Sequence, residues 1–395
     1  GVSAAVYYDT QSPTVDGVSF TASPTNTTAT INFAVTNTPR NGYASDVTDF
    51  AVSTATSASG VLAGEWQGYS GQTSATVTPP GDGLNTYYVY ARDEAGNIST
   101  GVSAAVYYDT QSPTVDGVSF TASPTNTTAT INFAVTNTPR NGYASDVTDF
   151  AVSTATSASG VLAGEWQGYS GQTSATVTPP GDGLNTYYVY ARDAAGNISA
   201  VSSGTYASLA YDTQIPAVGD VSFTKSPTNS PVINFTLTNT TKDGYASDVT
   251  DFAVSTAASA SGVLPGEWHA YSASTSYSFT PPNDGNHTYY VYARDAAGNV
   301  STGVSAAVYY DTQSPTVDGV SFTASPTNTT ATINFAVTNT PRNGYASDVT
   351  DFAVSTATSA SGVLAGEWQG YSGQTSATVT PPGDGLNTYY VYARD

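Results

Sequence analysis

The stretch Tyr87–Ser99, YYVYARDEAGNIS, and the segment Val106–Pro113, VYYDTQSP, decide how this chain is organised. The tyrosines and valine at its start favour a strand, and the Asp-x-x-Gly-Asn sequence that follows predicts a tight turn. A second strand then leads to a proline-marked crossing into the next unit. The stretch recurs almost unchanged at Tyr187–Ser199 and Tyr289–Ser301. The repeat is therefore the first feature to explain.

The repeat predicts four tandem domains, each with its own core. Residues 1–93, 101–193 and 303–395 are the same sequence, and the aspartate of Asp-Thr-Gln returns about every 100 residues. That period is too long for a solenoid repeat and matches one small domain. The chain is expected to be a window cut from a longer array. The predicted division is 1–8 as the last strand of a preceding, absent domain, 9–108 as domain 1, 109–211 as domain 2, 212–310 as the divergent domain 3, and 311–395 as domain 4 lacking its last strand.

The composition narrows the class of protein. The chain has no Cys and therefore no disulfide, and its 30 acidic against 9 basic residues give a formal net charge of −21. An acidic coat suits a soluble surface protein. It argues against nucleic acid as a partner, because phosphate binding needs clustered Lys and Arg. No apolar run approaches the ~20 residues of a membrane helix, so no membrane insertion is expected in this segment.

One unit contains about seven short strand patterns separated by turn residues. Alternation is clearest around Ile31 and Phe33, which are predicted to face a core. Short strands with turn signals every 8–12 residues are typical of an immunoglobulin-like β-sandwich, so the expected fold is all-β with four such sandwiches in an elongated array. In the strand 86–92, Tyr87, Val89 and Ala91 are predicted inward, and Tyr88, Tyr90 and Arg92 outward. The main predicted strands are 15–20, 28–36, 47–54, 73–78, 86–92 and 103–108.

The segment Tyr188–Ser199, YVYARDAAGNIS, and the segment Tyr108–Thr114, YDTQSPT, resemble the bacterial immunoglobulin-like and fibronectin-type-III-like repeats of large surface adhesins. Those repeats typically read Asp-x-x-Gly-Asn-x-Ser, then a strand, then Asp-Thr-x-x-Pro. The resemblance covers the whole chain. It implies a sandwich fold and a role as extender for most members, with ligand binding in a minority.

Carboxylates expected at one pole of each sandwich are the best candidates for chemistry. The turn after residues 86–92, the loop before residue 47 and the incoming linker share this pole, and the preceding domain's Pro-Gly-Asp turn faces it. Several carboxylates and an amide within reach of one point resemble a Ca²⁺ site, although no cofactor is required for the fold. The alternative is that Asp93 and Asn97 hydrogen-bond their own turn, with Gly96 or Asn97 left-handed. The candidate ligands are Asp9, Asp46, Asp82, Asp93, Asn97, Asp109, Asp146, Asp182, Asp193, Asn197, Asp212, Asp248, Asp295 and Asn299.

Other residues are weaker candidates for a binding or catalytic site. Trp66, Tyr88 and Tyr90 could form a sugar-stacking patch, or they could pair across strands. His269 and His287 are the only histidines and have no paired nucleophile nearby, which favours solvated surface positions. The sequence contains no catalytic constellation or phosphate-binding loop, so no enzyme activity is expected.

These features favour a structural segment of an extracellular stalk, adhesin or surface filament. Proline in the Asp-Thr-x-x-Pro linkers would restrict each hinge, and the expected partners are neighbouring identical domains. One alternative is a glycan-binding repeat module that acts through aromatic patches and avidity. Another is a spacer from a secreted polysaccharide-degrading protein. Each predicts an extracellular or cell-surface location.

The segment Gly1–Tyr8 has the same sequence as Gly101–Tyr108, the predicted last strand of domain 1. Each such strand is predicted to pair with the domain before it. A sandwich without this strand would expose an edge that recruits one. Another copy of the chain could supply the strand head to tail and build a filament. Alternatively, a longer chain is trimmed here and the same geometry holds covalently.

Overall fold

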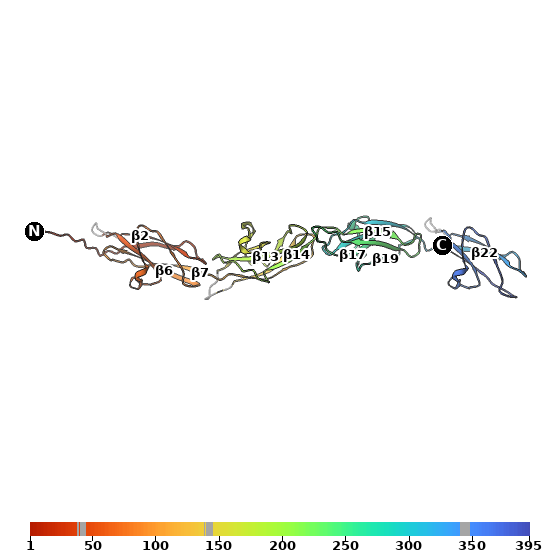
Figure 1. Cartoon of the computed structure of the whole chain (residues 1–395), viewed down its shortest axis with the longest axis horizontal. Helices are drawn as coiled ribbons and strands as arrows, with labels where there is room; N and C mark the ends of the chain where they lie inside the picture. Colours follow the sequence, from red (N-terminus) through yellow and green to blue (C-terminus); the bar gives the residue numbers. More distant parts are fainter. Residues whose placement is uncertain (38, 40–44, 138, 140–144, 340–347) are drawn as a thin grey trace. The chain divides into compact units, whose positions relative to one another are not determined.

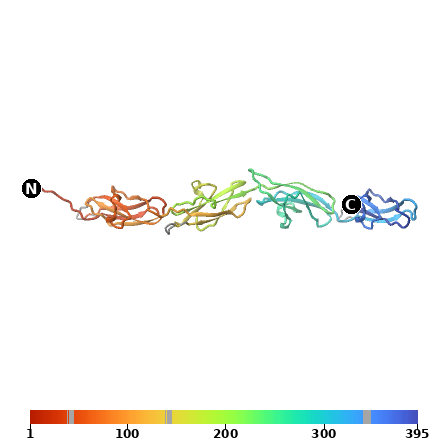
Figure 2. The ribbon, with the colours of Figure 1, turned by 60° about the horizontal axis from the view of Figure 1, so that its bottom comes forward.

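The computed structural model describes residues 1–37, 39, 45–137, 139, 145–339 and 348–395. The chain divides into two compact units, Gly1–Tyr211 and Asp212–Asp395, and each is described by itself. Both units consist of strands joined by turns, as Figures 1 and 2 show, and the described residues contain no α-helix. The all-β prediction is confirmed. No helix in this described part is long and apolar enough to cross a membrane.

The first unit contains two copies of one strand pattern. The first copy consists of β1 (Thr14–Phe20), β2 (Ala29–Thr36), β3 (Val47–Ser53), β4 (Trp66–Gly68), β5 (Ser74–Val77), β6 (Gly83–Asp93) and β7 (Val102–Tyr108). The second consists of β8 (Thr114–Phe120), β9 (Ala129–Thr136), β10 (Val147–Ser153), β11 (Trp166–Gly168), β12 (Ser174–Val177), β13 (Gly183–Asp193) and β14 (Tyr206–Tyr211).

The second unit contains the pattern again, in the divergent copy and in the last copy. The divergent copy consists of β15 (Ala217–Phe223), β16 (Val232–Thr238), β17 (Val249–Ser255), β18 (Trp268–Ala270), β19 (Ser276–Ser278), β20 (Gly285–Asp295) and β21 (Val304–Tyr310). The last copy consists of β22 (Thr316–Phe322), β23 (Ala331–Thr338), β24 (Asp351–Ser355), β25 (Trp368–Gly370), β26 (Ser376–Val379) and β27 (Tyr390–Arg394).

Short 3₁₀ turns lead into the tryptophan-bearing strand of every copy. In each second turn a glutamate accepts a hydrogen bond from the backbone N–H at the start of that turn, for example Leu62 N to Glu65 Oε2 at 2.7 Å. The turns are η1 (Ala58–Gly60), η2 (Ala63–Glu65), η3 (Ala158–Gly160), η4 (Ala163–Glu165), η5 (Ala260–Gly262), η6 (Pro265–Glu267), η7 (Ala360–Gly362) and η8 (Ala365–Glu367).

The first three copies are sandwiches of a three-stranded and a four-stranded antiparallel sheet. In the first copy the strand orders are β1-β2-β5 and β4-β3-β6-β7, and the second and third copies repeat this arrangement. The last copy has two three-stranded sheets, β22-β23-β26 and β25-β24-β27. The fold is therefore a tandem set of β-sandwiches. The assignment of the chain to four separate domains stays a prediction.

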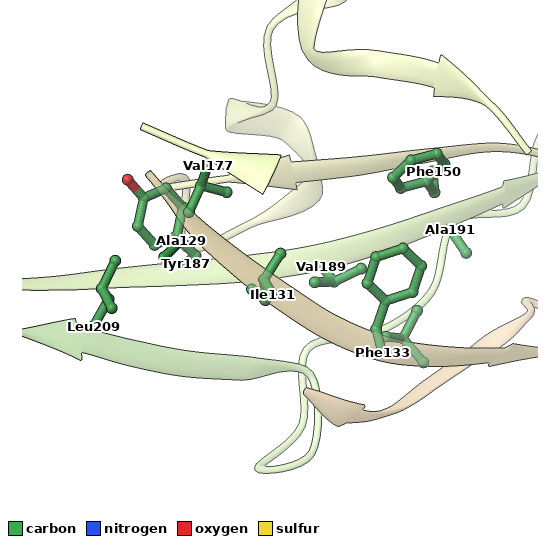
Figure 3. Packing of buried hydrophobic residues seen from close by; sticks show 10 residues of the cluster. Ala129, Ile131, Phe133, Phe150, Val177, Tyr187, Val189, Ala191 and Leu209 are labelled. Atoms are coloured by element: carbon green, nitrogen blue, oxygen red, sulfur yellow. The ribbon is translucent and has the colours of Figure 1, made fainter. Parts of the chain in front are cut away.

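Alternation along the strands places the core between the two sheets. Ile31 is fully buried, and Phe33 of β2 packs on Phe50 of β3 with ring centroids 5.2 Å apart. Figure 3 shows the same core in the second copy, where Ile131 and Phe133 lie toward Val189 and Phe150. Period-two alternation requires this outcome, because successive side chains of a strand point to opposite faces.

The last strand of a complete copy closes its core. β7 pairs with β6 from Gly83 opposite Tyr108 to Val89 opposite Val102, so the predicted pairing of this segment with the preceding copy is confirmed. Its central Val106 is fully buried. The backbone of Thr25 also donates to Tyr107 O at 3.0 Å. The end of β7 is therefore held by both sheets.

The outward prediction for Tyr90 is wrong. Tyr90 is 1% exposed, although it lies on the face of β6 opposite the core residues Val89 and Ala91. Its hydroxyl donates to Ala55 O at 2.8 Å, and Gly101 lies against its ring. The segment before β7 covers this outer face, which alternation along one strand cannot indicate.

Candidate functional site

The turn after β6 is held by its first residue. Asn97 N donates to Asp93 Oδ1 at 2.8 Å, and Gly96 N donates to Asp93 O at 3.0 Å. Gly96 has a φ of 92°, a left-handed conformation that glycine adopts without steric cost. Asp93 is 3% exposed. The predicted hydrogen bonding within this turn is therefore confirmed, with Gly96 as the left-handed residue.

A second aspartate joins the incoming linker to the loop before β3. Asp9 Oδ2 accepts hydrogen bonds from the backbone N–H of Ser45 at 2.8 Å and from its hydroxyl at 2.7 Å. Asp9 Oδ1 accepts from the backbone N–H of Gln11 at 2.9 Å. The backbone donors of Ser45 and Gln11, followed by the Ser45 hydroxyl, lower the pKa of Asp9. This carboxylate is therefore held in its ionised form.

The asparagine of the turn connects these two aspartates. Asn97 Nδ2 donates to Asp93 Oδ2 at 3.0 Å and to the backbone carbonyl of Asp9 at 3.1 Å. Linker, turn and loop thus form one hydrogen-bonded cluster, which we call the pole network. It recurs with Asp109, Ser145, Asp193 and Asn197, and with Asp212, Ser247, Asp295 and Asn299.

Inside the first unit, the pole network of the second copy contacts the first copy. Asn26 Nδ2, in the turn between β1 and β2, donates to Asn197 Oδ1 at 3.0 Å. Asp82 Oδ1, in the turn between β5 and β6, accepts from the backbone N–H of Thr110 at 2.9 Å. Asp109 is fully buried, and its backbone N–H donates to Thr25 O at 3.0 Å. Asp82 and Asn197 therefore both bond to the linker, at Thr110 and at the Asp109 carbonyl.

The remaining predicted ligands lie at the margins of the network. Asp46, Asp146 and Asp248 contribute backbone carbonyls, which accept from the residue after the turn aspartate at 2.9–3.0 Å. Asp248 Oδ1 also accepts from Asn239 Nδ2 at 3.1 Å. Asp182 lies in the turn between β12 and β13. Within the described ranges, no group of three or more acidic or histidine side chains is placed to hold a metal ion. The calcium sites stay a prediction.

Several partners in the network were not among the predicted site residues, among them Ser45, Thr25 and Asn26. The serine before β3 supplies two donors, and Thr25 and Asn26 join the first copy to the second. The repeated Ala-Ser-Asp-Val sequence before each third strand offered a signal for the serine. Nothing in the local sequence indicates that Asn26 meets Asn197, because the two residues come from different repeats.

The predicted aromatic patch is largely engaged within the protein. The Arg92 guanidinium lies 4.6 Å from the Trp66 ring centroid and is also 3.0 Å from Asp49 Oδ2. Tyr90 is buried, as described above, with Tyr88 stacked beside it at 6.5 Å between centroids. In the divergent copy, His269 packs on Tyr277 at 4.4 Å. In this patch Trp66 thus packs on Arg92, and Tyr88 and Tyr90 are neighbours along the single strand β6. Sugar binding by these residues stays a prediction.

Comparisons with known proteins give only distant structural matches. No family model matches the chain, and no curated protein matches it. Among solved structures, fibronectin(III)-like modules of CbhA from Clostridium thermocellum are 14% identical, with a TM-score of 0.28, and cover 49% of this chain and 93% of that one. The FN1–FN3 domains of chicken CNTN1 are 14% identical, with a TM-score of 0.27, and cover 75% and 98%. The fold assignment therefore rests on the sheet topology of this chain.

Proposed function

We propose that this chain is a structural segment of an extracellular stalk or surface filament, in which the sandwiches act as extenders with restricted hinges. The joint inside the first unit carries this proposal. There, Asn26 bonds to Asn197, Thr110 bonds to Asp82, and Asp109 is fully buried. Hydrogen bonds on separate sides of a short linker oppose bending, because a rotation about the linker must break at least one of them.

The composition supports the same role. The chain carries a formal net charge of −21 with only 9 basic residues, and a like-charged surface keeps neighbouring chains apart in solution. The bacterial surface repeats that the sequence resembles serve mostly as extenders, and we extend that role, with its extracellular or cell-surface location, to this chain. Identical copies at a fixed period suit a protein in which length is the selected property.

The test measures how much the joint bends. The chain has no cysteine, so Ser59→Cys and Ser159→Cys create two exposed spin-label sites in successive copies. We expect a narrow distance distribution for the parent chain. We expect a broader one when Asn26→Ala is combined with Asp82→Ala, because both side chains that bond across the joint are then lost.

The matched control is Asn328→Ala. Asn328 occupies the same place in the last copy as Asn26 in the first, and it is exposed. This change should leave the distribution between the two labels unaltered. A parent distribution as broad as that of the double variant would contradict the restricted-hinge proposal.

A further inference from the structure

The last strand of the second copy differs from that of the first and divergent copies. β14 has Tyr206 opposite Tyr188, whereas β7 has Ser103 opposite Tyr88, and β21 likewise has a serine at this register position. β14 also has Ser208 where β7 and β21 have alanine. The second copy therefore gains an aromatic ring and a further hydroxyl at two neighbouring register positions.

The added ring lies exposed beside a second tyrosine. The ring centroids of Tyr206 and Tyr188 are 5.2 Å apart with an angle of 38° between the rings, and Tyr206 is 41% exposed. The neighbours of Tyr188 along β13, Tyr187 and Val189, point into the core together with Leu209 (Figure 3). Because side chains alternate along a strand, the tyrosine pair lies on the outer face of the four-stranded sheet.

Hydroxyl and apolar groups continue this surface along the two strands. Thr186 Oγ1 and Ser208 Oγ lie 2.8 Å apart, next to the tyrosine pair in the register. Leu184, which is 70% exposed, follows opposite Ala210. From Leu184 to Tyr188 the surface extends about 14 Å, at ~3.4 Å per residue. We call it the tyrosine platform, and it consists of Leu184, Thr186 and Tyr188 of β13 and Tyr206, Ser208 and Ala210 of β14.

The platform has the chemical groups that recognise an uncharged sugar. A sugar ring has apolar C–H faces that pack on an aromatic ring, and tyrosine adds a polar hydroxyl at the ring edge. The hydroxyls of Thr186 and Ser208 both donate and accept, so they can exchange hydrogen bonds with sugar hydroxyls. None of the platform residues is charged, although the chain has a formal net charge of −21. Since that net charge repels anionic ligands, the platform favours an uncharged glycan.

Pairing of the last strand does not explain the presence of Tyr206. β7 pairs with β6 in the same way with Ser103 at this position. The core beneath β14 is closed by Leu209, which is fully buried and points to the other face. A cross-strand tyrosine pair adds only about 0.2–1 kcal/mol to a sheet. The exposed part of the Tyr206 ring is therefore available to a ligand.

We propose that the tyrosine platform binds a linear, uncharged glycan that lies along β13 and β14. One sugar ring packs on Tyr206, and the adjoining sugars bond to the hydroxyls of Thr186 and Ser208. This site is separate from the predicted patch of Trp66 and its neighbouring tyrosines in the first copy. Glycan binding goes beyond the extender role and does not depend on it.

Calorimetric titration of the full chain with cellohexaose, mannohexaose and laminarihexaose is the test. We expect at least one of these glycans to bind at one site per chain. Tyr206→Ser should weaken that binding about tenfold or more, because the ring contact is lost. This variant keeps its fold, since the first copy forms the same strand pairing with serine at this position. The matched control is Tyr88→Ala, which changes the tyrosine of the first copy and should leave the affinity unaltered.

A converse variant builds the platform in the first copy. Ser103 and Ala105 are exposed, so Ser103→Tyr combined with Ala105→Ser should keep the fold and raise the stoichiometry to two sites per chain. A stoichiometry that stays at one would overturn the proposal. Binding that survives Tyr206→Ser, or the absence of binding by all three glycans, would also overturn it. Loss of binding in Tyr88→Ala would assign the binding to the predicted patch of the first copy instead.

Sedimentation without glycan tests a second copy of this chain as the occupant of the platform. We expect the parent and Tyr206→Ser to sediment alike at every concentration. Association of the parent that Tyr206→Ser abolishes would overturn the glycan proposal, because the platform would then bind protein. None of these outcomes alters the bending test described above.

Discussion

The first and last copies share one sequence, 1–93 and 303–395, but they differ in structure. β6 has 11 residues, whereas its counterpart β27 has 5. Tyr87 is 5% exposed, whereas Tyr389 is only half-buried although it has the same neighbours in sequence. What the first copy has in addition is β7, whose pairing with β6 spans this region. The comparison teaches that the final strand closes the core and orders the strand before it.

The largest expected effect comes from removing that closure. Val106→Asp places a carboxylate at a fully buried position and should destabilise the first copy by more than about 3 kcal/mol. In calorimetry one transition should separate and move to lower temperature. Ala105→Asp, at an exposed neighbouring position, should leave the profile unchanged. Equal effects of the two variants would contradict the conclusion that β7 closes the core of the first copy.

Truncating the same tyrosine in each copy would sharpen the comparison between the first and last copies. Tyr87→Ala should cost the first copy about 3 kcal/mol, because a buried aromatic side chain is replaced by a cavity. Tyr389→Ala should cost the last copy less, about 1–2 kcal/mol, since Tyr389 is only half-buried. Urea unfolding of the two variants gives both values. Similar losses would mean that the two cores are equally closed.

A smaller effect is expected at the residue before β7. A Cβ at Gly101 would come within 2.5 Å of the Tyr90 ring, so Gly101→Ala should destabilise the first copy by about 1–3 kcal/mol. Gly1 is followed by the same sequence as Gly101, but no atom lies within 4 Å of a Cβ added there, so Gly1→Ala should be neutral. Thermal unfolding of the two variants provides the check, and a neutral Gly101→Ala would show that Tyr90 can move aside.

Acid should weaken both copies, because each contains a carboxylate whose pKa is lowered in the folded chain. Donors from Ser45 and Gln11 lower the pKa of Asp9 in the first copy. The Arg394 hydrogen bond, followed by that of Thr350, lowers the pKa of Asp351 in the last. A lowered folded pKa stabilises the protein above the unfolded value of about 3.9, and this stability is lost as the pH falls through the folded pKa. As the pH is lowered from about 5 to about 2.5, the melting temperature should therefore fall less steeply for Asp9→Asn than for the parent.

The smallest effect is expected from calcium. In the pole network the carboxylate oxygens of Asp9 and Asp93 already accept hydrogen bonds from Ser45, Gln11 and Asn97. We therefore expect the melting temperature and the maximum dimension from scattering to be the same with calcium and with a chelator. A fall in both on chelation would instead establish the predicted metal sites. The more buried Asp109 would then be the first residue to replace.

Alternation within the sequence placed the core residues Ile31 and Phe33 and six strands of a copy, but it missed the short strand β4. It failed at Tyr90, because the segment that covers Tyr90 comes from beyond the following turn. The residue types of the pole network were also readable, since aspartate and asparagine bond to their own turns. The sequence did not predict the partners Ser45 and Asn26, because each belongs to a chain segment far away in sequence.

The end of β7 is hydrogen-bonded both to β6 and to Thr25, and this has a mechanical consequence. Force that leaves the first copy through Asp109 reaches β7 first, and antiparallel hydrogen bonds run perpendicular to the strands they join. A pull along β7 therefore loads its bonds to β6 together in shear, from Gly83–Tyr108 to Val89–Val102. The bonds from Thr25 to Tyr107 and Asp109 hold the point where the load enters. A copy with this geometry should unfold abruptly at high force. If the bonds were loaded one after another, they would break in sequence at lower force.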